Sequence, residues 1–251
     1  MIKKILLLFA LLLIIAYLAV AITALNKEPL NAVCNDIELI IKDTTNENFI
    51  TKQEIGALLK SKGLYPVQEK MERIKTKKLE KELAKHPLIE KAECYKTPSN
   101  KLCIEITQRV PILKVMSNNG DEYYLDNKGR IIPPGAKCIA HLAVVTGNVE
   151  KSFAMRYLHK FGVFLHQNKF WNAQIEQINV LPEKDIELVP RVGNHTIYLG
   201  KIDNFEEKLS RLKVFYKKAL NQVGWNKYSR INLEFNNQII CTKNKKTLHS
   251  Q

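Results

Sequence analysis

The chain has 251 residues, of which 45% are hydrophobic and 25% charged. It can therefore bury one large or two small cores, which argues against a chain that is disordered or of low complexity as a whole. Ten glycines and nine prolines without a period, and only five cysteines, exclude a collagen-like chain and a disulfide-stapled mini-scaffold. Its formal net charge of +14 suits nucleic acid, anionic lipid or an acidic protein as partner, and does not choose among them.

A charge-free apolar run, residues 5–25, follows Lys3 and Lys4 at the N-terminus. A helix of this length crosses the hydrocarbon layer of roughly 30 Å. The positive-inside rule then keeps residues 1–4 in the cytoplasm and places the rest of the chain on the far side. A cleaved signal peptide is the alternative, because Ala19-Val20-Ala21 has the pattern of a cleavage site. We favour an uncleaved anchor, since the run exceeds the apolar core of about 7–15 residues in a signal peptide.

Export of the chain makes nucleic acid an unfavoured partner. The basic residues are spread along expected helix faces and in a C-terminal segment, residues 242–251, which we expect to be a disordered basic tail. Their ordinary role is solubility, with attraction to anionic lipid head groups or an acidic partner second.

The five cysteines are odd in number and form no CxxC motif, which excludes a redox motif and a zinc knuckle; they are Cys34, Cys94, Cys103, Cys138 and Cys241. Cys94 and Cys103 flank an expected turn. Alternation places Cys94 on the apolar face of one strand and Cys103 on the solvent face of the next, and side chains on opposite faces cannot be bridged. We therefore expect free or buried thiols.

The first exported segment predicts a strand, two helices and a hairpin. Residues 33–42 are rich in Val and Ile, as in a strand. Thr51-Lys52-Gln53-Glu54 is a capping box, and Gly63 stands where a C′ glycine ends a helix. A second helix is expected over residues 76–86, with Leu79, Leu83 and Ala84 as its apolar stripe, before a hairpin over residues 88–108. Three strands in one sheet with both helices on one face make a compact α+β module, residues 33–110.

A second domain, residues 111–241, begins where Pro111 removes a ladder donor. A meander of short antiparallel strands is expected from residue 112 through the turns at residues 119–120 and 126–129, and residues 142–145 predict another strand. Helices are expected over residues 152–166, with Met155, Leu158, Phe161 and Leu165 on one face, and over residues 204–224, with Leu209, Leu212, Phe215, Tyr216 and Leu220. Further strands are expected at 175–181, 186–190 and 196–199. The last element, residues 228–241, alternates apolar and polar residues and predicts one half-buried strand.

Motifs for catalysis are missing from the sequence. The six histidines lack the i, i+4 spacing of a zinc protease, no glycine loop could cradle a phosphate, and no Gly-x-Ser-x-Gly elbow occurs. Two acidic pairs, Asp185 with Glu187 and Asp121 with Glu122, are interpreted as surface residues, because carboxylates are ordinarily exposed. We therefore expect a binding protein rather than an enzyme, with no metal and no cofactor.

The combination of a short basic N-terminus, one apolar span, a strand-helix-helix-strand-strand module and a mixed β domain resembles the FtsQ/DivIB family of bacterial cell-division proteins. The local matches are the hairpin that leads into Arg109-Val110-Pro111, the stretch 120–133 with Tyr123-Tyr124-Leu125-Asp126, the strand end Val144-Val145-Thr146-Gly147, and the terminal segment 228–240. The likeness covers nearly the whole chain.

The resemblance implies a non-enzymatic divisome scaffold that links early to late division proteins. It implies a single-pass protein of the inner membrane at the division site, with a POTRA-like module for recruitment and a β domain that binds FtsB- and FtsL-like membrane proteins along its last strands. Where the family often carries Asp and Arg, this chain has Asn232 and Glu234, so the family's arginine contact is not carried over.

Strand physics and the resemblance together give a candidate partner site. A strand that ends the fold is a natural sheet edge, with backbone groups open to a strand from another chain. The expected partner-binding residues are Tyr228, Arg230, Ile231, Asn232, Leu233, Glu234, Phe235, Gln238 and Ile239. The alternatives are a strand paired inside the sheet, a POTRA-bearing factor in outer-membrane protein assembly or transport, and an exported enzyme or solute-binding domain.

Overall fold

The computed structural model describes residues 2–25, 32–42, 50–134 and 142–244. By its internal contacts the chain divides into two compact units. Unit 1 comprises Met1–Lys42, Thr51–Ala84 and Lys91–Ile106, and unit 2 comprises Asp43–Ile50, Lys85–Glu90 and Thr107–Gln251. Each unit is built around its own sheet.

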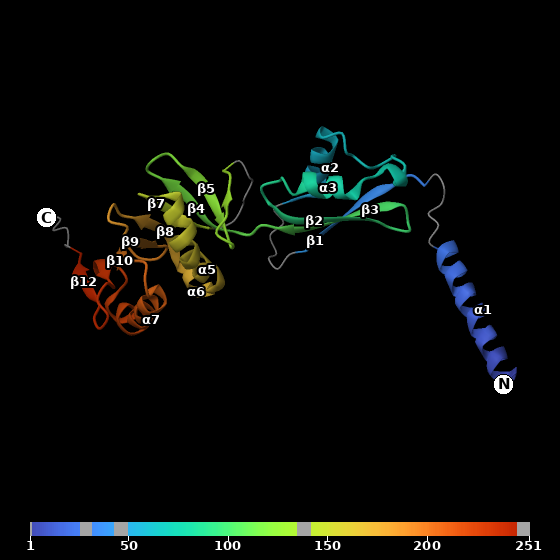
Figure 1. Ribbon diagram of the computed structural model, residues 1–251. Helices are drawn as coiled ribbons and strands as arrows, with labels where there is room; N and C mark the ends of the chain where they lie inside the picture. Colours follow the sequence, from blue (N-terminus) through green and yellow to red (C-terminus); the bar gives the residue numbers. More distant parts are fainter. Residues whose placement is uncertain (1, 26–31, 43–49, 135–141, 245–251) are drawn as a thin grey trace. The chain divides into compact units, whose positions relative to one another are not determined.

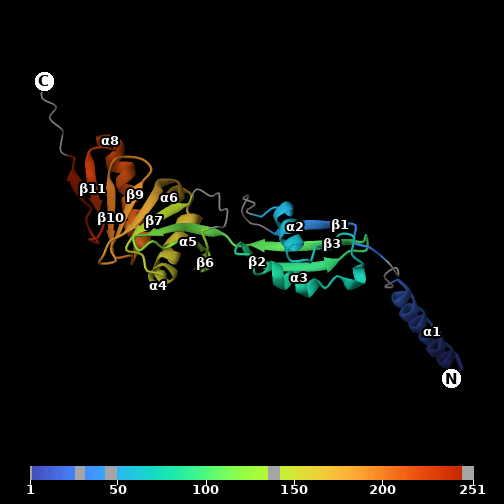
Figure 2. The same ribbon diagram turned by 90° about the horizontal axis from the view of Figure 1, so that it is seen from above.

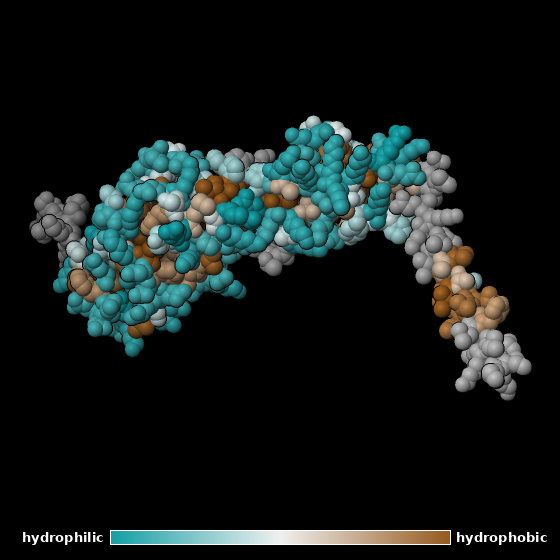
Figure 3. All heavy atoms as spheres, viewed as in Figure 1, coloured by the Kyte–Doolittle hydropathy of each residue, from teal (hydrophilic) through white to brown (hydrophobic). Residues whose placement is uncertain are grey.

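The N-terminal helix α1 spans Ile2–Leu25. Its described side chains, residues 9–21, form an apolar surface in which Phe9 is 64% and Tyr17 74% exposed (Figure 3). Within the part of the chain that the structure describes, no helix reaches the length and apolarity of a membrane span.

Unit 1 contains a three-stranded sheet with the order β1-β3-β2, and two helices lie on one face of it (Figure 1). Its elements are β1 (Asp36–Lys42), α2 (Lys52–Ser61), the 3-10 turn η1 (Met71–Arg73), α3 (Thr76–Leu83), β2 (Ile89–Lys96) and β3 (Lys101–Gln108). The expected order of strand, helix, helix, strand and strand is confirmed.

The start and end of α2 follow from its sequence. The backbone N–H of Glu54 donates to Oγ1 of Thr51 at 3.2 Å, and the N–H of Thr51 donates to the Glu54 carboxylate at 3.0 Å, so the predicted capping box is present. Gly63 follows the helix with a φ of +65°, a conformation that glycine adopts without steric cost.

The second helix, α3, is shorter than expected. Leu79 and Leu83 are 2% and 0% exposed, as predicted, but the helix ends at Leu83 and Ala84 is exposed. Pro87 disfavours helical geometry in the residue before it, and the chain turns there, with the N–H of Ile89 donating to the carbonyl of His86 at 3.0 Å. The extension of the helix to residue 86 was therefore wrong.

The four described cysteines are free: Cys34, Cys94 and Cys103 are buried and Cys241 is half-buried. The placement of Cys103 on a solvent face was wrong, since it is 2% exposed. Its side chain interacts with Tyr95 of the neighbouring strand, whose hydroxyl also donates to Glu105 at 2.8 Å. Cys138 lies outside the described residues.

Unit 2 contains a nine-stranded sheet with the order β12-β11-β10-β9-β8-β7-β4-β5-β6. The strands are β4 (Pro111–Ser117), β5 (Glu122–Asp126), β6 (Ile131–Ile132), β7 (Ala143–Gly147), β8 (Ile175–Val180), β9 (Ile186–Pro190), β10 (Thr196–Gly200), β11 (Tyr228–Asn232) and β12 (Ile240–Lys243). The antiparallel meander is confirmed for β4, β5 and β6. The strand predicted over residues 142–145 is present as β7, which pairs in parallel with β4 and with β8.

Helices cover one face of this sheet (Figures 1 and 2). The first run comprises α4 (Lys151–Phe153), a π-helical turn η2 (Ala154–Leu158), α5 (His159–Gln167) and α6 (Lys169–Gln174). The second comprises α7 (Phe205–Phe215), a π-helical turn η3 (Tyr216–Leu220) and α8 (Asn221–Val223).

The apolar stripes of these helices form most of the core of unit 2. Leu158, Phe161 and Leu165 are buried as predicted, but Met155 is 44% exposed while its neighbour Ala154 is fully buried. A π-helical turn adds a residue to the helical repeat and shifts which side chains face the sheet. In the second run Leu209, Leu212, Tyr216 and Leu220 are buried, and Phe215 packs partly buried against the same core.

A buried carboxylate, that of Asp126, organises the start of unit 2. The side chain of Asp126 is 0% exposed. Its Oδ2 accepts hydrogen bonds from Nε of Arg109 at 2.9 Å and Nε of Arg130 at 2.8 Å, and its Oδ1 accepts backbone bonds from Lys128 and Arg130. Burial alone would raise the pKa of Asp126, but these donors outweigh it and hold the pKa below its usual value.

Candidate functional site

The candidate partner site lies in the C-terminal hairpin, which we define as β11, β12 and the loop 233–239. β11 runs parallel to β10, with Ile197 opposite Ile231, and antiparallel to β12, with Cys241 opposite Ile231. β11 is therefore an internal strand. The expectation of one continuous edge strand over residues 228–241 was wrong.

The chain leaves the sheet after Asn232 because local polar contacts stabilise a loop there. Oδ1 of Asn232 accepts a hydrogen bond from the backbone N–H of Glu234 at 2.8 Å. This arrangement is an Asx turn. The guanidinium of Arg211, on α7, donates to the carbonyl of Leu233 at 3.1 Å and also to those of Phe235 and Asn236. These carbonyls are thereby satisfied without a partner strand.

The expected site residues divide into two groups in the structure. Ile231 and Leu233 are 0% exposed, and Ile239 is partly buried against the same core. Tyr228 belongs with them, because it packs partly buried against that core, with its ring centroid 6.2 Å from that of Phe215. These side chains anchor the hairpin in the core of unit 2. The surface group comprises the exposed residues Glu234, Phe235 and Gln238, together with Arg230 and Asn232 on β11.

Arg230 belongs to a polar network that crosses three strands on the face of the sheet opposite Ile231. Its guanidinium lies 4.5 Å from the ring centroid of Tyr198 on β10 and 3.6 Å from the Glu187 carboxylate on β9. Both contacts fix the direction of a long side chain at the surface. The two contacts direct the Arg230 side chain over β10 and β9.

The same network contains Asp185, which was interpreted as a surface carboxylate but is 9% exposed. Its carboxylate accepts the Tyr198 hydroxyl at 2.6 Å and pairs with the Lys201 ammonium at 2.7 Å. Burial favours a higher pKa for Asp185, but the two donors prevail and lower it, while the hydrogen bond to Asp185 raises the pKa of Tyr198 to about 12. Asp121 and Glu122 keep the predicted surface role, paired with Lys151 and Lys114.

The edge of the sheet is β12, which sequence reasoning did not separate from β11. Among the described strands, β12 pairs only with β11, so one row of its N–H and C=O groups faces away from the sheet. Ile240 is 45% exposed on this strand and Phe235 is 43% exposed in the loop before it. The pair Asn236-Asn237 was the signal for a turn, since asparagine favours turns.

Two residues assigned to the basic tail, Thr242 and Lys243, lie in β12. Asn244 follows β12 and its side-chain amide donates to the carbonyl of Asn226 at 2.7 Å, while residues 245–251 fall outside the described part of the chain. Over the residues that are described, no cluster of His, Cys, Asp or Glu could hold a metal ion. The unpaired edge of β12 is the kind of surface to which another chain can add a strand.

Comparison with known proteins identifies relatives of both parts of the chain. The sequence profile described as FtsQ/DivIB, C-terminal related matches residues 110–242, more than half of the chain, and a POTRA-like domain matches residues 32–107. The Cell division protein FtsQ of Rhodothermus marinus is 28% identical over 169 residues. That alignment covers 63% of this chain and 62% of the relative, so it spans less than two thirds of the relative's length. The matches support a role in cell division.

Proposed function

The chain belongs to the FtsQ/DivIB family, and on that premise we propose that it is a non-enzymatic scaffold of the cell-division machinery. In this role it binds FtsB- and FtsL-like membrane proteins on the exported side and links early to late division proteins. The curated relative is named for cell division, and a binding role suits a chain whose sequence carries no catalytic motif.

The open edge of β12 is the observation that carries the proposal. A partner segment added antiparallel or parallel to β12 would extend the sheet by one strand and satisfy the outward row of backbone groups. Backbone pairing supplies affinity in this mode, and side chains on either face supply selectivity. The partner's strand, and not a side chain of this chain, is then the main element of recognition.

The side chains that would select the partner are those beside the edge. Ile240 and Phe235 offer exposed apolar surface, and Lys243 offers a charge on the same strand. Arg230, exposed one strand further in, is the next to meet a bulky partner residue. Ile231 and Leu233 are withdrawn from this list, because they are buried.

The membrane anchor is part of the same proposal. Residues 5–25 carry no charge and follow Lys3 and Lys4, a pattern that favours one inner-membrane crossing with the N-terminus in the cytoplasm. The two lysines would then meet anionic lipid head groups, and the exported part would reach its partners at the division site.

Localisation and depletion test the function. A fluorescent fusion of the full chain should form a band at mid-cell, and depletion should give filaments that replicate without dividing. An even envelope signal with normal division would instead favour the outer-membrane assembly role, and a diffuse exported signal would favour an enzyme or solute-binding domain. Either result would contradict the proposal.

A further inference from the structure

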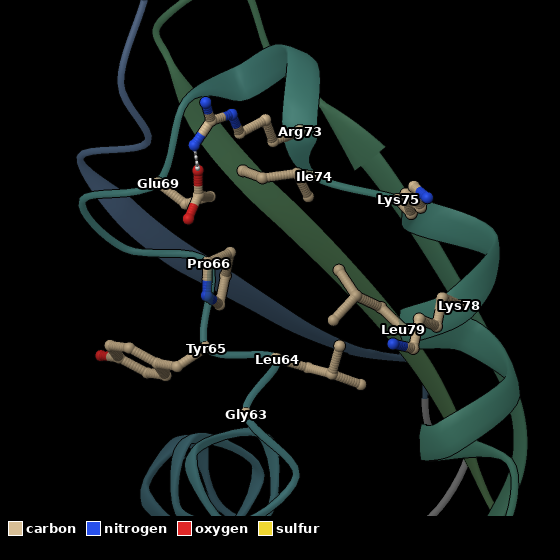
Figure 4. A pocket seen from close by; sticks show the side chains of 10 residues that line it. All are labelled: Gly63, Leu64, Tyr65, Pro66, Glu69, Arg73, Ile74, Lys75, Lys78 and Leu79. Atoms are coloured by element: carbon tan, nitrogen blue, oxygen red, sulfur yellow. Dashed lines mark ion pairs between the residues drawn. The ribbon is translucent and has the colours of Figure 1, made fainter.

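A recess in unit 1 lies between the end of α2 and the start of α3 (Figure 4). Its volume is about 290 Å³. The lining comes from one continuous stretch of chain, residues 63–79, and comprises Gly63, Leu64, Tyr65, Pro66, Glu69, Arg73, Ile74, Lys75, Lys78 and Leu79. The proposed docking edge, in unit 2, does not include any of these residues.

The floor of the recess is apolar. The side chains of Leu64, Ile74 and Leu79 point toward one another in Figure 4. Ile74 is 8% and Leu79 2% exposed, while Leu64 is half-buried. Leu64 therefore retains apolar surface that a bound side chain could cover.

The rim of the recess is cationic. Lys75 and Lys78 lie along the side formed by α3, and Arg73 lies at the opposite end, where it pairs with Glu69 at 3.9 Å. The side chains of that pair are 73% and 46% exposed, so the pair holds Arg73 only weakly. Lys75 and Lys78 form no ion pair within the described part of the chain.

The positive charge extends beyond the rim. Residues 60–81 contain eight basic and three acidic residues, and hydrophilic side chains dominate the surface over α2 and α3 (Figure 3). The ammonium of Lys60 lies 4.6 Å from the ring centroid of Tyr65, beside the recess. An approaching anion therefore meets several cations and few carboxylates.

We propose that this recess docks an acidic segment of a partner protein, with one apolar side chain of that segment seated on Leu64, Ile74 and Leu79 and its carboxylates beside Lys75 and Lys78. The proposal rests on the scaffold function, to which it adds a second docking point with a defined partner chemistry. Charge complementarity identifies the occupant as anionic, and the concave floor identifies it as a chain with a protruding apolar side chain.

A bilayer surface is the less suitable occupant. Anionic lipid head groups bind lysines that project from a convex or flat face of a protein. The apolar floor at Leu64 is instead recessed between the end of α2 and the start of α3. The volume is near the lower end of the roughly 300–1,000 Å³ range of small-molecule sites, which suits a side chain better than a lipid tail.

The test uses the full chain in a non-ionic detergent and fluorescence anisotropy with a labelled peptide, Glu-Glu-Leu-Glu-Glu. We expect saturable binding at low salt. A peptide with serine in place of leucine, and one with lysine in place of every glutamate, should each bind at least tenfold more weakly. The first comparison measures the contribution of the leucine side chain to binding, and the second measures the contribution of the peptide's negative charge.

Two double variants provide the matched comparison. Lys75→Glu with Lys78→Glu should weaken peptide binding at least tenfold. Lys77→Glu with Lys81→Glu makes the same change of net charge nearby, at exposed residues of α3 that do not line the recess, and should weaken peptide binding less than threefold. Circular dichroism and thermal unfolding of both variants should match the parent chain.

Three outcomes would overturn the proposal. One is no discrimination between the leucine and serine peptides, and another is an equal loss in both double variants. The third is binding to vesicles with anionic phosphatidylglycerol that both double variants abolish, without peptide binding, because a membrane would then be the ligand. Any of these can occur while the β12 edge still binds its partner, so failure here is distinguishable from failure of the scaffold function.

Discussion

Nε of Arg109 lies 2.9 Å from Oδ2 of Asp126, and the Asp126 side chain is completely buried. The same guanidinium donates to the carbonyls of Pro87 and Ile131 at 3.1 Å each. One arginine thus ties together three segments of unit 2, and the buried charge of Asp126 is what holds that arginine in place.

Replacing Asp126 with asparagine should destabilise the chain strongly. The variant keeps the side-chain shape but leaves the Arg109 guanidinium, 13% exposed, without its counter-charge, and breaking a buried pair in this way costs about 3–5 kcal/mol. Urea unfolding of the full chain measures the loss. The control, Glu122→Gln, removes the exposed partner of Lys114 and should cost about 0–1 kcal/mol. Similar losses in the two variants would contradict the assignment.

The stability of the chain at acid pH should depend on the same carboxylate, that of Asp126. The pKa of Asp126 is lowered in the folded chain, so its stabilising contribution is complete above the unfolded value of about 3.9 and is lost as the pH falls through the lower folded value. The free energy of unfolding of the parent chain should therefore fall more steeply below about pH 4 than that of Asp126→Asn. Parallel curves would show that Asp126 is not the titrating group.

Protonation of a buried histidine, His195, should also lower the stability of the chain, at a higher pH than protonation of Asp126. His195 is 2% exposed, its Nε2 lies 3.0 Å from the Tyr216 hydroxyl, and burial lowers its pKa. The unfolded chain then binds the proton more readily, so stability is complete above about pH 6.5 and declines as the pH falls below that value. In His195→Gln, which cannot titrate at this position, the free energy of unfolding should change less between pH 5 and 7 than in the parent chain. An unchanged slope would assign the effect to other groups.

The cysteines should report the exposure of the hairpin. Cys241 is half-buried on the edge strand, whereas Cys34 and Cys94 are buried and burial raises the pKa of the Cys94 thiol to about 12. Alkylation followed by peptide mass spectrometry should therefore modify Cys241 well before Cys34 or Cys94. Addition of a purified FtsB-like partner should slow modification of Cys241. Equal rates at Cys94 and Cys241 would contradict this order.

Local sequence rules predicted unit 1 well because its signals are local. The Thr51 capping box and the buried Leu79 and Leu83 follow from spacing within a single helix. The burial of Cys103 did not follow, because it depends on tertiary contacts such as the one that its side chain makes with Tyr95 of another strand. Alternation predicts which face a side chain takes, but not whether the opposite face is covered.

The candidate site was harder to predict for a related reason. The alternation over residues 228–241 is interrupted by a loop that depends on Arg211, more than twenty residues upstream. The register of β11 with β10 is parallel and likewise nonlocal. The sequence alone suggests Asn232→Pro as a probe of a docking edge. In the structure Asn232 lies in the internal strand β11, so the proline would disrupt the sheet and would not separate folding from binding.

In-cell photocrosslinking at the edge strand tests the central claim most directly. A photoreactive benzoylphenylalanine replaces Thr242 on β12, and in a matched strain it replaces Val192, which is 50% exposed in the loop between β9 and β10. We predict a covalent adduct with a small division membrane protein from position 242 and none from position 192. Adducts of equal yield at both positions, or none at position 242 in dividing cells that depend on this chain, would contradict docking at the β12 edge.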